Sequence, residues 1–273
     1  MLGVMIKGVL AIDLDGTLLV GEHVPDDNVR AVRAARDAGY GIVIATARWH
    51  HMALRVAESI GIEGPVIACS GAQVYLPSES RDIFDQRLPA EFVEVLYECC
   101  DADRCIATVT VSDRVLLKLD GKPDPAQMPP EMVWVQKLAG AADSLPRVAA
   151  IQGTAINARI RTELQPRFRD HIHVFDSVGP TGKLILTITA KTASKGAALL
   201  AACEHLGVAA SRVIAIGDAE NDIEMFRVAG TSVAMGQAEA AVKEAATTVT
   251  GRNDEAGVAQ VIDRLLTTGS VVG

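Results

Sequence analysis

The chain has 273 residues and a formal net charge of −8 at pH 7, from 26 Lys and Arg against 34 Asp and Glu. At about 150 residues per domain, this length suits one large or two ordinary domains. Hydrophobic residues make up 49% of the chain and aromatic residues 4%, which predicts an aliphatic core and excludes a disordered chain. Because nucleic-acid clamps and binders of anionic membranes are normally basic, the acidic balance argues against both kinds of partner.

The amino-terminal run MLGVMIKGVLAIDLDG does not predict a secretion signal, because Lys7 interrupts it and Asp13 and Asp15 end it. No stretch reaches the ~18 apolar residues that a membrane-spanning helix needs. The five cysteines are an odd number without the spacing of zinc ligands. We therefore expect reduced thiols in a soluble, cytoplasmic protein that binds neither membranes nor nucleic acid.

Predicted strands and helices alternate at both ends of the chain, a pattern typical of a parallel sheet with helices on both faces. The sequence therefore predicts an α/β fold with a doubly wound, Rossmann-like parallel sheet. Strands are expected at 6–13, 41–45, 66–69, 213–216, 231–235 and 247–250, and helices at 25–38, 50–60, 195–206, 220–228, 238–246 and 255–266.

The pattern changes between these two stretches. Residues 105–119 alternate around Ser112-Asp113-Arg114, which predicts a hairpin of antiparallel strands. We therefore expect residues 81–188 to form an inserted α+β domain, while 1–80 and 189–273 together form the core. Within the insert, helices are expected at 90–101 and near 155–165, and further strands at 133–135, 148–151, 172–175 and 184–188.

Four polar clusters follow predicted strands or open a predicted helix. In open parallel sheets, ligands bind beyond the carboxyl ends of the strands, so a site is expected there. The clusters are Asp13-Leu14-Asp15-Gly16-Thr17, Thr46-Ala47-Arg48, Lys195, and Gly217-Asp218 with Asn221-Asp222.

The first cluster places two carboxylates close together. Asp13 and Asp15 would repel each other unless a positive charge lay between them. Mg²⁺ supplies that charge, prefers hard oxygen ligands and keeps positions for phosphate oxygens and water. With Asp218 as a third carboxylate, the pattern predicts a metal site that would hold a phosphate.

The motifs resemble those of the haloacid dehalogenase (HAD) superfamily in order and spacing. Four motifs in order are much more specific than the first one alone. The insert between the second and third motifs is similar to the cap of the Cof-type (subfamily IIB) phosphatases. The motifs are DLDGT at 13–17, ATAR at 45–48, Lys195-Gly196, and GDAEND at 217–222 followed by VAMG at 233–236.

The resemblance implies a magnesium-dependent phosphatase, a phosphoric monoester hydrolase that acts on a small phosphorylated metabolite such as a sugar phosphate. Asp13 would be the nucleophile that forms an aspartyl-phosphate, and Asp15 the general acid and base. The expected metal ligands are Asp13, Asp218 and the backbone carbonyl of Asp15.

The remaining roles concern the phosphate oxygens, which need positive charge and N–H donors in the transition state. Asp222 is expected to orient Lys195 or a metal-bound water. By the resemblance, phosphate or substrate is bound by Lys195, the Thr46 hydroxyl, the backbone N–H groups of Leu14 and Ala47, the Asn221 amide and Arg48.

The chain departs from the Cof-type pattern at three positions. Ala47 stands where Gly is usual, so its backbone can approach the phosphate only with an ordinary φ. Ser70 replaces the usual Asn before Gly71, and Gln237 replaces a common Asn after VAMG.

Two alternatives remain open at this point. A phosphomutase would use the same aspartyl-phosphate and return the group to the substrate. A non-catalytic phosphometabolite-binding protein would not need an acid and base at Asp15. The sequence leaves the ester and the choice between monomer and homodimer open.

Overall fold

The computed structural model describes residues 6–178 and 182–272, so the first five residues and the last one of the expected core lie outside the description. The chain divides into two compact units, at Phe84/Asp85 and at Ala193/Ser194. The expected boundaries, 80/81 and 188/189, fall a few residues earlier. The difference arises because β5 (Arg81–Asp85) still belongs to the first sheet and β11 (Leu184–Ala190) extends the second.

The first unit contains an eight-stranded sheet in the order β14-β13-β12-β1-β2-β3-β4-β5. The pairs from β14 to β3 are parallel, and β4 is antiparallel to β3. This order confirms the predicted α/β fold with its parallel core. Besides β5, the strands are β1 (Val9–Ile12), β2 (Gly41–Ala45), β3 (Val66–Ala68), β4 (Gln73–Leu76), β12 (Val213–Gly217), β13 (Thr231–Ala234) and β14 (Thr248–Val249).

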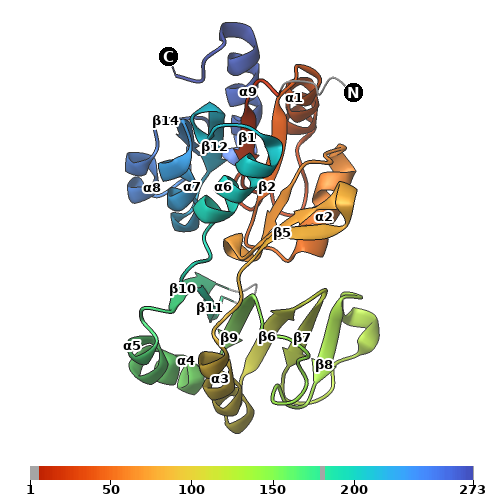
Figure 1. Cartoon of the computed structure of the whole chain (residues 1–273), viewed down its shortest axis with the longest axis vertical. Coiled ribbons are helices and arrows are strands. Elements are labelled where there is room, and N and C mark those ends of the chain that lie inside the picture. Colours follow the sequence, from red (N-terminus) through yellow and green to blue (C-terminus); the bar gives the residue numbers. More distant parts are fainter. Residues whose placement is uncertain (1–5, 179–181, 273) are drawn as a thin grey trace. The chain divides into compact units, whose positions relative to one another are not determined.

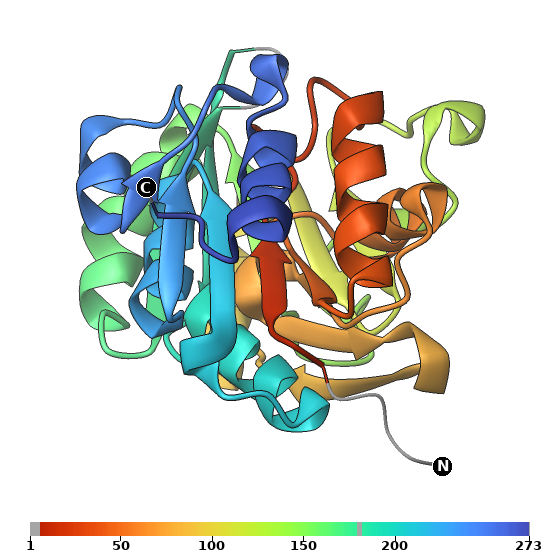
Figure 2. The same ribbon diagram turned by 90° about the horizontal axis from the view of Figure 1, so that it is seen from above.

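Helices cover both faces of this sheet. Helix α1 packs against α9, and α6 packs against α7; Figure 2 shows the two pairs on opposite sides of the strands. The helices are α1 (Asp26–Asp37), α2 (His50–Ile60), α6 (Lys195–Leu206), α7 (Ile223–Val228), α8 (Ala240–Ala245) and α9 (Gly257–Thr268).

Strand β1 lies at the centre of the sheet, and all four of its residues are fully buried. Val9 and Ala11 pack into the core that α6 and α7 cover, and their neighbours along the strand point to the opposite face. A strand buried on both faces needs apolar residues throughout. The first polar residue after it, Asp13, therefore marks the carboxyl edge of the sheet.

Strands β4 and β5 were not expected from the sequence. Both are short, and the exposed, charged Arg81 and Asp85 at its two ends give β5 little apolar alternation. Strand β4 adds an antiparallel pair to the parallel sheet, an arrangement that is common in doubly wound folds, and β5 lies beside it at the edge.

The second unit is α+β, as expected for the insert. Its six-stranded sheet has the order β10-β11-β9-β6-β7-β8, with only β7 and β8 parallel. Phe92 of α3 and Phe168 meet edge to face in its core, with ring centroids 5.3 Å apart. Besides β11, the elements are α3 (Ala90–Ala102), β6 (Ile106–Val111), β7 (Arg114–Lys118), β8 (Met132–Val135), β9 (Val148–Gln152), α4 (Thr154–Arg159), a π-helical turn (Ile160–Leu164), α5 (Gln165–Arg167) and β10 (Ile172–Val178), and Figure 1 labels the helices and strands.

A close approach in the first unit fixes where α6 begins. Gly71 has a φ of 87°, and a Cβ there would lie 2.2 Å from the carbonyl carbon of Ser194 and 2.4 Å from the nitrogen of Lys195. The Ser194 side chain also caps α6 by accepting a hydrogen bond from the Ala197 N–H. Only glycine therefore lets the turn after β3 support the first residues of α6.

We predict that Gly71→Ala lowers the free energy of unfolding by about 2 kcal/mol or more, since it adds a backbone clash to an unfavourable φ. Gly269→Ala is the control, because Gly269 has a φ of 76° and nothing within 4 Å of a Cβ. The control should cost about 1 kcal/mol. Urea unfolding monitored by circular dichroism measures both; equal losses would contradict the prediction.

Candidate functional site

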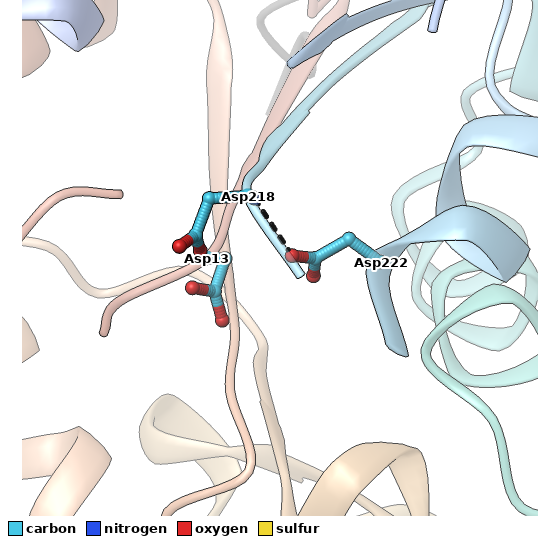
Figure 3. Close-up of side chains that lie close together, drawn as sticks. All are labelled: Asp13, Asp218 and Asp222. Carbon is cyan, nitrogen blue, oxygen red and sulfur yellow. Dashed lines mark hydrogen bonds between the residues drawn. The ribbon is translucent and has the colours of Figure 1, made fainter. Parts of the chain in front are cut away.

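Side chains from three neighbouring strands meet at the carboxyl edge of the first sheet. Asp13, Thr46 and Asp218 directly follow β1, β2 and β12, and these strands are adjacent in the order β12-β1-β2. Figure 3 shows the Asp13 and Asp218 side chains close together, with Asp222 pointing toward them from the segment before α7. The strand ends therefore bring together residues more than 200 positions apart in the sequence.

A buried lysine joins two of these carboxylates. The Lys195 Nζ donates to Asp13 Oδ1 and to Asp222 Oδ1, at 2.6 Å each. Lys195 is 1% exposed, Asp13 4% and Asp222 0%. Burial alone would lower the pKa of Lys195, but the two carboxylates outweigh it and raise that pKa, so the ammonium stays charged.

Asp222 uses its second oxygen to hold the backbone that follows β12. Its Oδ2 accepts from the N–H groups of Asp218 and Ala219, at 3.0 Å each. With Lys195 on the other oxygen, Asp222 has three donors and keeps little capacity for a further ligand. The arrangement fixes both Lys195 and the chain that carries Asp218.

Asp13, Asp218 and Asp222 form an acidic cluster in which one ligand atom from each residue lies within 4.8 Å of the others. Burial raises the pKa of Asp13 well above its usual value; the charges of Asp222 and Asp218 add to this rise, and Lys195 opposes it. Burial also raises the pKa of Asp218, with Asp222 adding to the effect. Three carboxylates against one ammonium leave negative charge uncompensated, and their hard oxygen atoms fit a divalent cation.

Asp15 is not a member of this acidic cluster and pairs with Arg48 instead. The Arg48 guanidinium donates to both Asp15 oxygens, with Nε at 3.1 and 2.9 Å and Nη2 at 2.6 Å, and Nη1 donates to Glu22 at 3.0 Å. The hydrogen bonds with Asp15 are the main cause that raises the pKa of Arg48. In this structure Asp15, the predicted general acid and base, thus pairs with Arg48, which was predicted to bind substrate.

The other predicted phosphate-binding residues lie in the segments that follow β1, β2 and β12. Thr46 is fully buried, and its hydroxyl accepts a hydrogen bond from the Arg48 N–H at 3.1 Å. Ala47 is not among the described residues with positive φ, so its backbone has the ordinary conformation that its methyl group requires. Leu14 has a buried side chain, which leaves only its backbone for the predicted role. The Asn221 Oδ1 is buried and has no hydrogen-bond partner among the described residues.

The sequence analysis did not predict the contacts of three residues at this site, Thr17, Gln237 and Glu22. It had noted the first two for other reasons. Thr17 donates from Oγ1 to Asp218 Oδ1 at 3.1 Å, and Gln237 donates to the Gly16 carbonyl at 2.5 Å. Thr17 belongs to the DLDGT motif, and Gln237 had been noted only as a departure from the family pattern. Glu22, which pairs with Arg48, lies outside the four motifs, so the sequence did not indicate it.

Comparison with known proteins agrees with the motifs. The family model described as haloacid dehalogenase-like hydrolase matches residues 10–262. The chain is 29% identical over 254 residues to 5-amino-6-(5-phospho-D-ribitylamino)uracil phosphatase YcsE of Bacillus subtilis, covering 93% of each chain. It is 30% identical over 271 residues to pyridoxal phosphate phosphatase YbhA of Escherichia coli, covering 94% of this chain and 98% of that protein.

A solved structure shares the fold along almost the whole chain. It is a haloacid dehalogenase-like hydrolase from Bacteroides thetaiotaomicron, with a TM-score of 0.82 at 25% identity, covering 95% of this chain and 99% of that one. These matches confirm the resemblance that the four motifs indicated. Among the residues that the structure describes, no helix has the length and apolar character to cross a membrane.

We predict that Lys195→Met lowers the free energy of unfolding by about 3–5 kcal/mol, because it leaves the buried Asp13 and Asp222 carboxylates without their cation. Lys7→Met is the control, since Lys7 is exposed in the same unit. The free energy of unfolding is measured by urea titration at pH 7, with a chelator present so that no divalent cation is bound. A Lys195→Met chain as stable as the control would show that the ammonium does not compensate these charges.

Proposed function

Because the chain belongs to the haloacid dehalogenase-like hydrolases and is thus an enzyme, we propose that it is a magnesium-dependent phosphatase of a small phosphate monoester. The reaction would pass through an aspartyl-phosphate on Asp13. The observation that carries this proposal is the buried contact of Lys195 with Asp13 and Asp222 beside Asp218. It combines a nucleophile, a fixed positive charge and oxygen ligands for a cation at one strand edge.

The relatives support the choice of substrate class. Both are named as phosphatases, one of them for a compound with a phosphate on a ribityl chain. We therefore propose that this chain hydrolyses a phosphorylated metabolite of similar size, with a sugar phosphate as the first class to test.

In the first half of the reaction, a carboxylate oxygen of Asp13 would attack phosphorus in line with the leaving oxygen. A bond forms between that oxygen and phosphorus, the ester P–O bond breaks, and the departing alkoxide takes a proton from Asp15. In the second half, Asp15 would take a proton from the water that attacks the aspartyl-phosphate. Inorganic phosphate then leaves, and the Asp13 carboxylate is restored.

Asp13, Asp218 and the Asp15 backbone carbonyl would hold the Mg²⁺, which supplies positive charge for the phosphate oxygens when it is bound. Asp222 would keep its contacts with Lys195 and with the backbone at 218–219. The three protein donors on Asp222 support this division, because they leave that carboxylate little capacity for a metal.

The phosphate oxygens would be bound by Lys195, which contacts Asp13, and by groups from the segments that follow β1, β2 and β12. These are the Lys195 ammonium, the Thr46 hydroxyl, the Asn221 amide and the backbone N–H groups of Leu14 and Ala47. Arg48 would contact the substrate after Asp15 turns from its guanidinium toward the leaving oxygen, and the exposed position of Asp15 leaves room for that turn.

The second unit, Asp85–Ala193, would act as the cap that selects the leaving group. Its size and α+β sheet match the expected cap, and the relatives align over nearly the whole chain, with this unit included. All five cysteines are free and buried, which suits a reducing cytoplasm. The protein would work there as a monomer or homodimer.

We predict that Asp13→Asn lowers kcat/KM by on the order of 10⁴-fold or more, because the amide cannot attack phosphorus.

Removing divalent cations with a chelator should abolish turnover of the wild-type chain, and adding Mg²⁺ should restore it. The assay is phosphate release from a panel of sugar phosphates. Isomer formation without phosphate release would instead support a phosphomutase, and no reaction on any ester would refute the proposal.

We predict that Asp15→Asn affects substrates according to their leaving group. For alkyl phosphates, kcat/KM should fall by about 10²-fold or more, since an alkoxide needs a proton as it departs. For p-nitrophenyl phosphate the fall should be much smaller, because nitrophenolate leaves without a proton. Equal losses on both substrates would contradict the acid role of Asp15.

A further inference from the structure

Gln237 occupies a central place in the hydrogen bonds around the DLDGT loop. Its Nε2 donates to the Gly16 carbonyl at 2.5 Å, and its Oε1 accepts from the Asn253 N–H at 3.1 Å. A carbonyl can only accept and a backbone N–H can only donate, so these two partners fix which way the amide points.

The Asp218 carboxylate lies near the Gln237 amide, and its Oδ1 accepts a hydrogen bond from the Thr17 hydroxyl at 3.1 Å. Gln237 thus binds the loop that begins with Asp13 through the Gly16 carbonyl, next to the carboxylate that follows β12. These two segments supply the proposed metal ligands.

The loop itself leaves little freedom at this place. Gly16 has a φ of 79°, and a Cβ there would lie 2.2 Å from Asp218 Oδ2. The Gly16 backbone therefore packs directly on the Asp218 carboxylate. Asn253 ties the far end of the same loop, because its Nδ2 donates to the Leu19 carbonyl at 3.0 Å.

We propose that Gln237 is a positioning residue of the metal site, which sets the Asp218 carboxylate against the loop that carries Asp13. The inference rests on the proposed magnesium-dependent function. The length of the side chain is essential to it, since Gln237 spans from the Asn253 N–H to the Gly16 carbonyl. An asparagine is one methylene shorter and cannot make both hydrogen bonds from the same backbone.

The test measures Mg²⁺ binding to the whole chain by isothermal titration calorimetry, together with kcat and KM. Gln237→Leu removes the amide, and Gln237→Asn keeps an amide but shortens its reach. Both should weaken Mg²⁺ binding by about 10-fold or more, the usual effect of losing a partner that orients a metal ligand. In activity assays, the Mg²⁺ concentration for half-maximal rate should rise by a similar factor.

Gln260→Leu is the matched control, because Gln260 donates its side-chain amide to the Glu255 carbonyl in the same unit. It should leave Mg²⁺ binding unchanged, although it also removes one glutamine hydrogen bond. Circular dichroism and thermal unfolding establish that each variant is folded at the temperature of the titration. If Gln237→Leu does not fold, Gln237→Asn decides the question.

Two results would overturn the inference, and they are distinguishable. If the wild-type chain binds Mg²⁺ and the Kd of the Gln237 variants for Mg²⁺ lies within twofold of the wild-type value, Gln237 does not position the metal site. If the wild-type chain binds no Mg²⁺ at all, the proposed metal-dependent function fails and this inference fails with it.

Discussion

The buried ion pair of Lys195 with Asp13 and Asp222 is the interaction on which the rest of the first unit depends. An ammonium and two carboxylates can be buried only if every charge has partners and the backbone holds them still. Each neighbouring feature serves this end. Gly71 allows the turn after β3 to reach the start of α6, and the second oxygen of Asp222 accepts from the two N–H groups after β12. The site and the stability of the fold therefore rest on the same few contacts.

The architecture could be predicted from the sequence because it depends on local signals. Strand β1 is apolar in every position since both of its faces are covered, and α6 begins at a serine cap and ends at Gly207, which has a φ of 64°. The parallel arrangement then places the residues after β1 and β12 at one edge without any knowledge of their contacts. Strands β4 and β5 escaped prediction because both are short and because the charged residues Arg81 and Asp85 hide the periodicity of β5.

The sequence predicted which motif residues would lie close together at the strand ends, but it predicted few of the contacts between them. Motif spacing brought Asp13, Lys195, Asp218 and Asp222 together, since each follows a strand or opens a helix. A motif does not indicate which partner a long, flexible side chain contacts. The ion pairs of Arg48 with Asp15 and Glu22 could therefore be identified only from the structure. The same holds for Gln237, whose partners lie 221 residues before it and 16 residues after it in the sequence.

Charge connects these observations with the acidic character of the whole chain. Asp13, Asp218 and Asp222 carry three negative charges, and Lys195 returns one positive charge, so the cluster has a formal charge of −2 when all four are ionised. The adjacent pair of Asp15 and Arg48 adds nothing to this sum, and Glu22 adds another negative charge. A phosphate dianion would meet repulsion at such a site. In the proposed function, one divalent cation would bring this cluster of four residues to neutrality, and Lys195 and the backbone N–H groups could then attract the phosphate. In the proposed reaction, bound metal is thus a condition for binding substrate as well as for the chemistry.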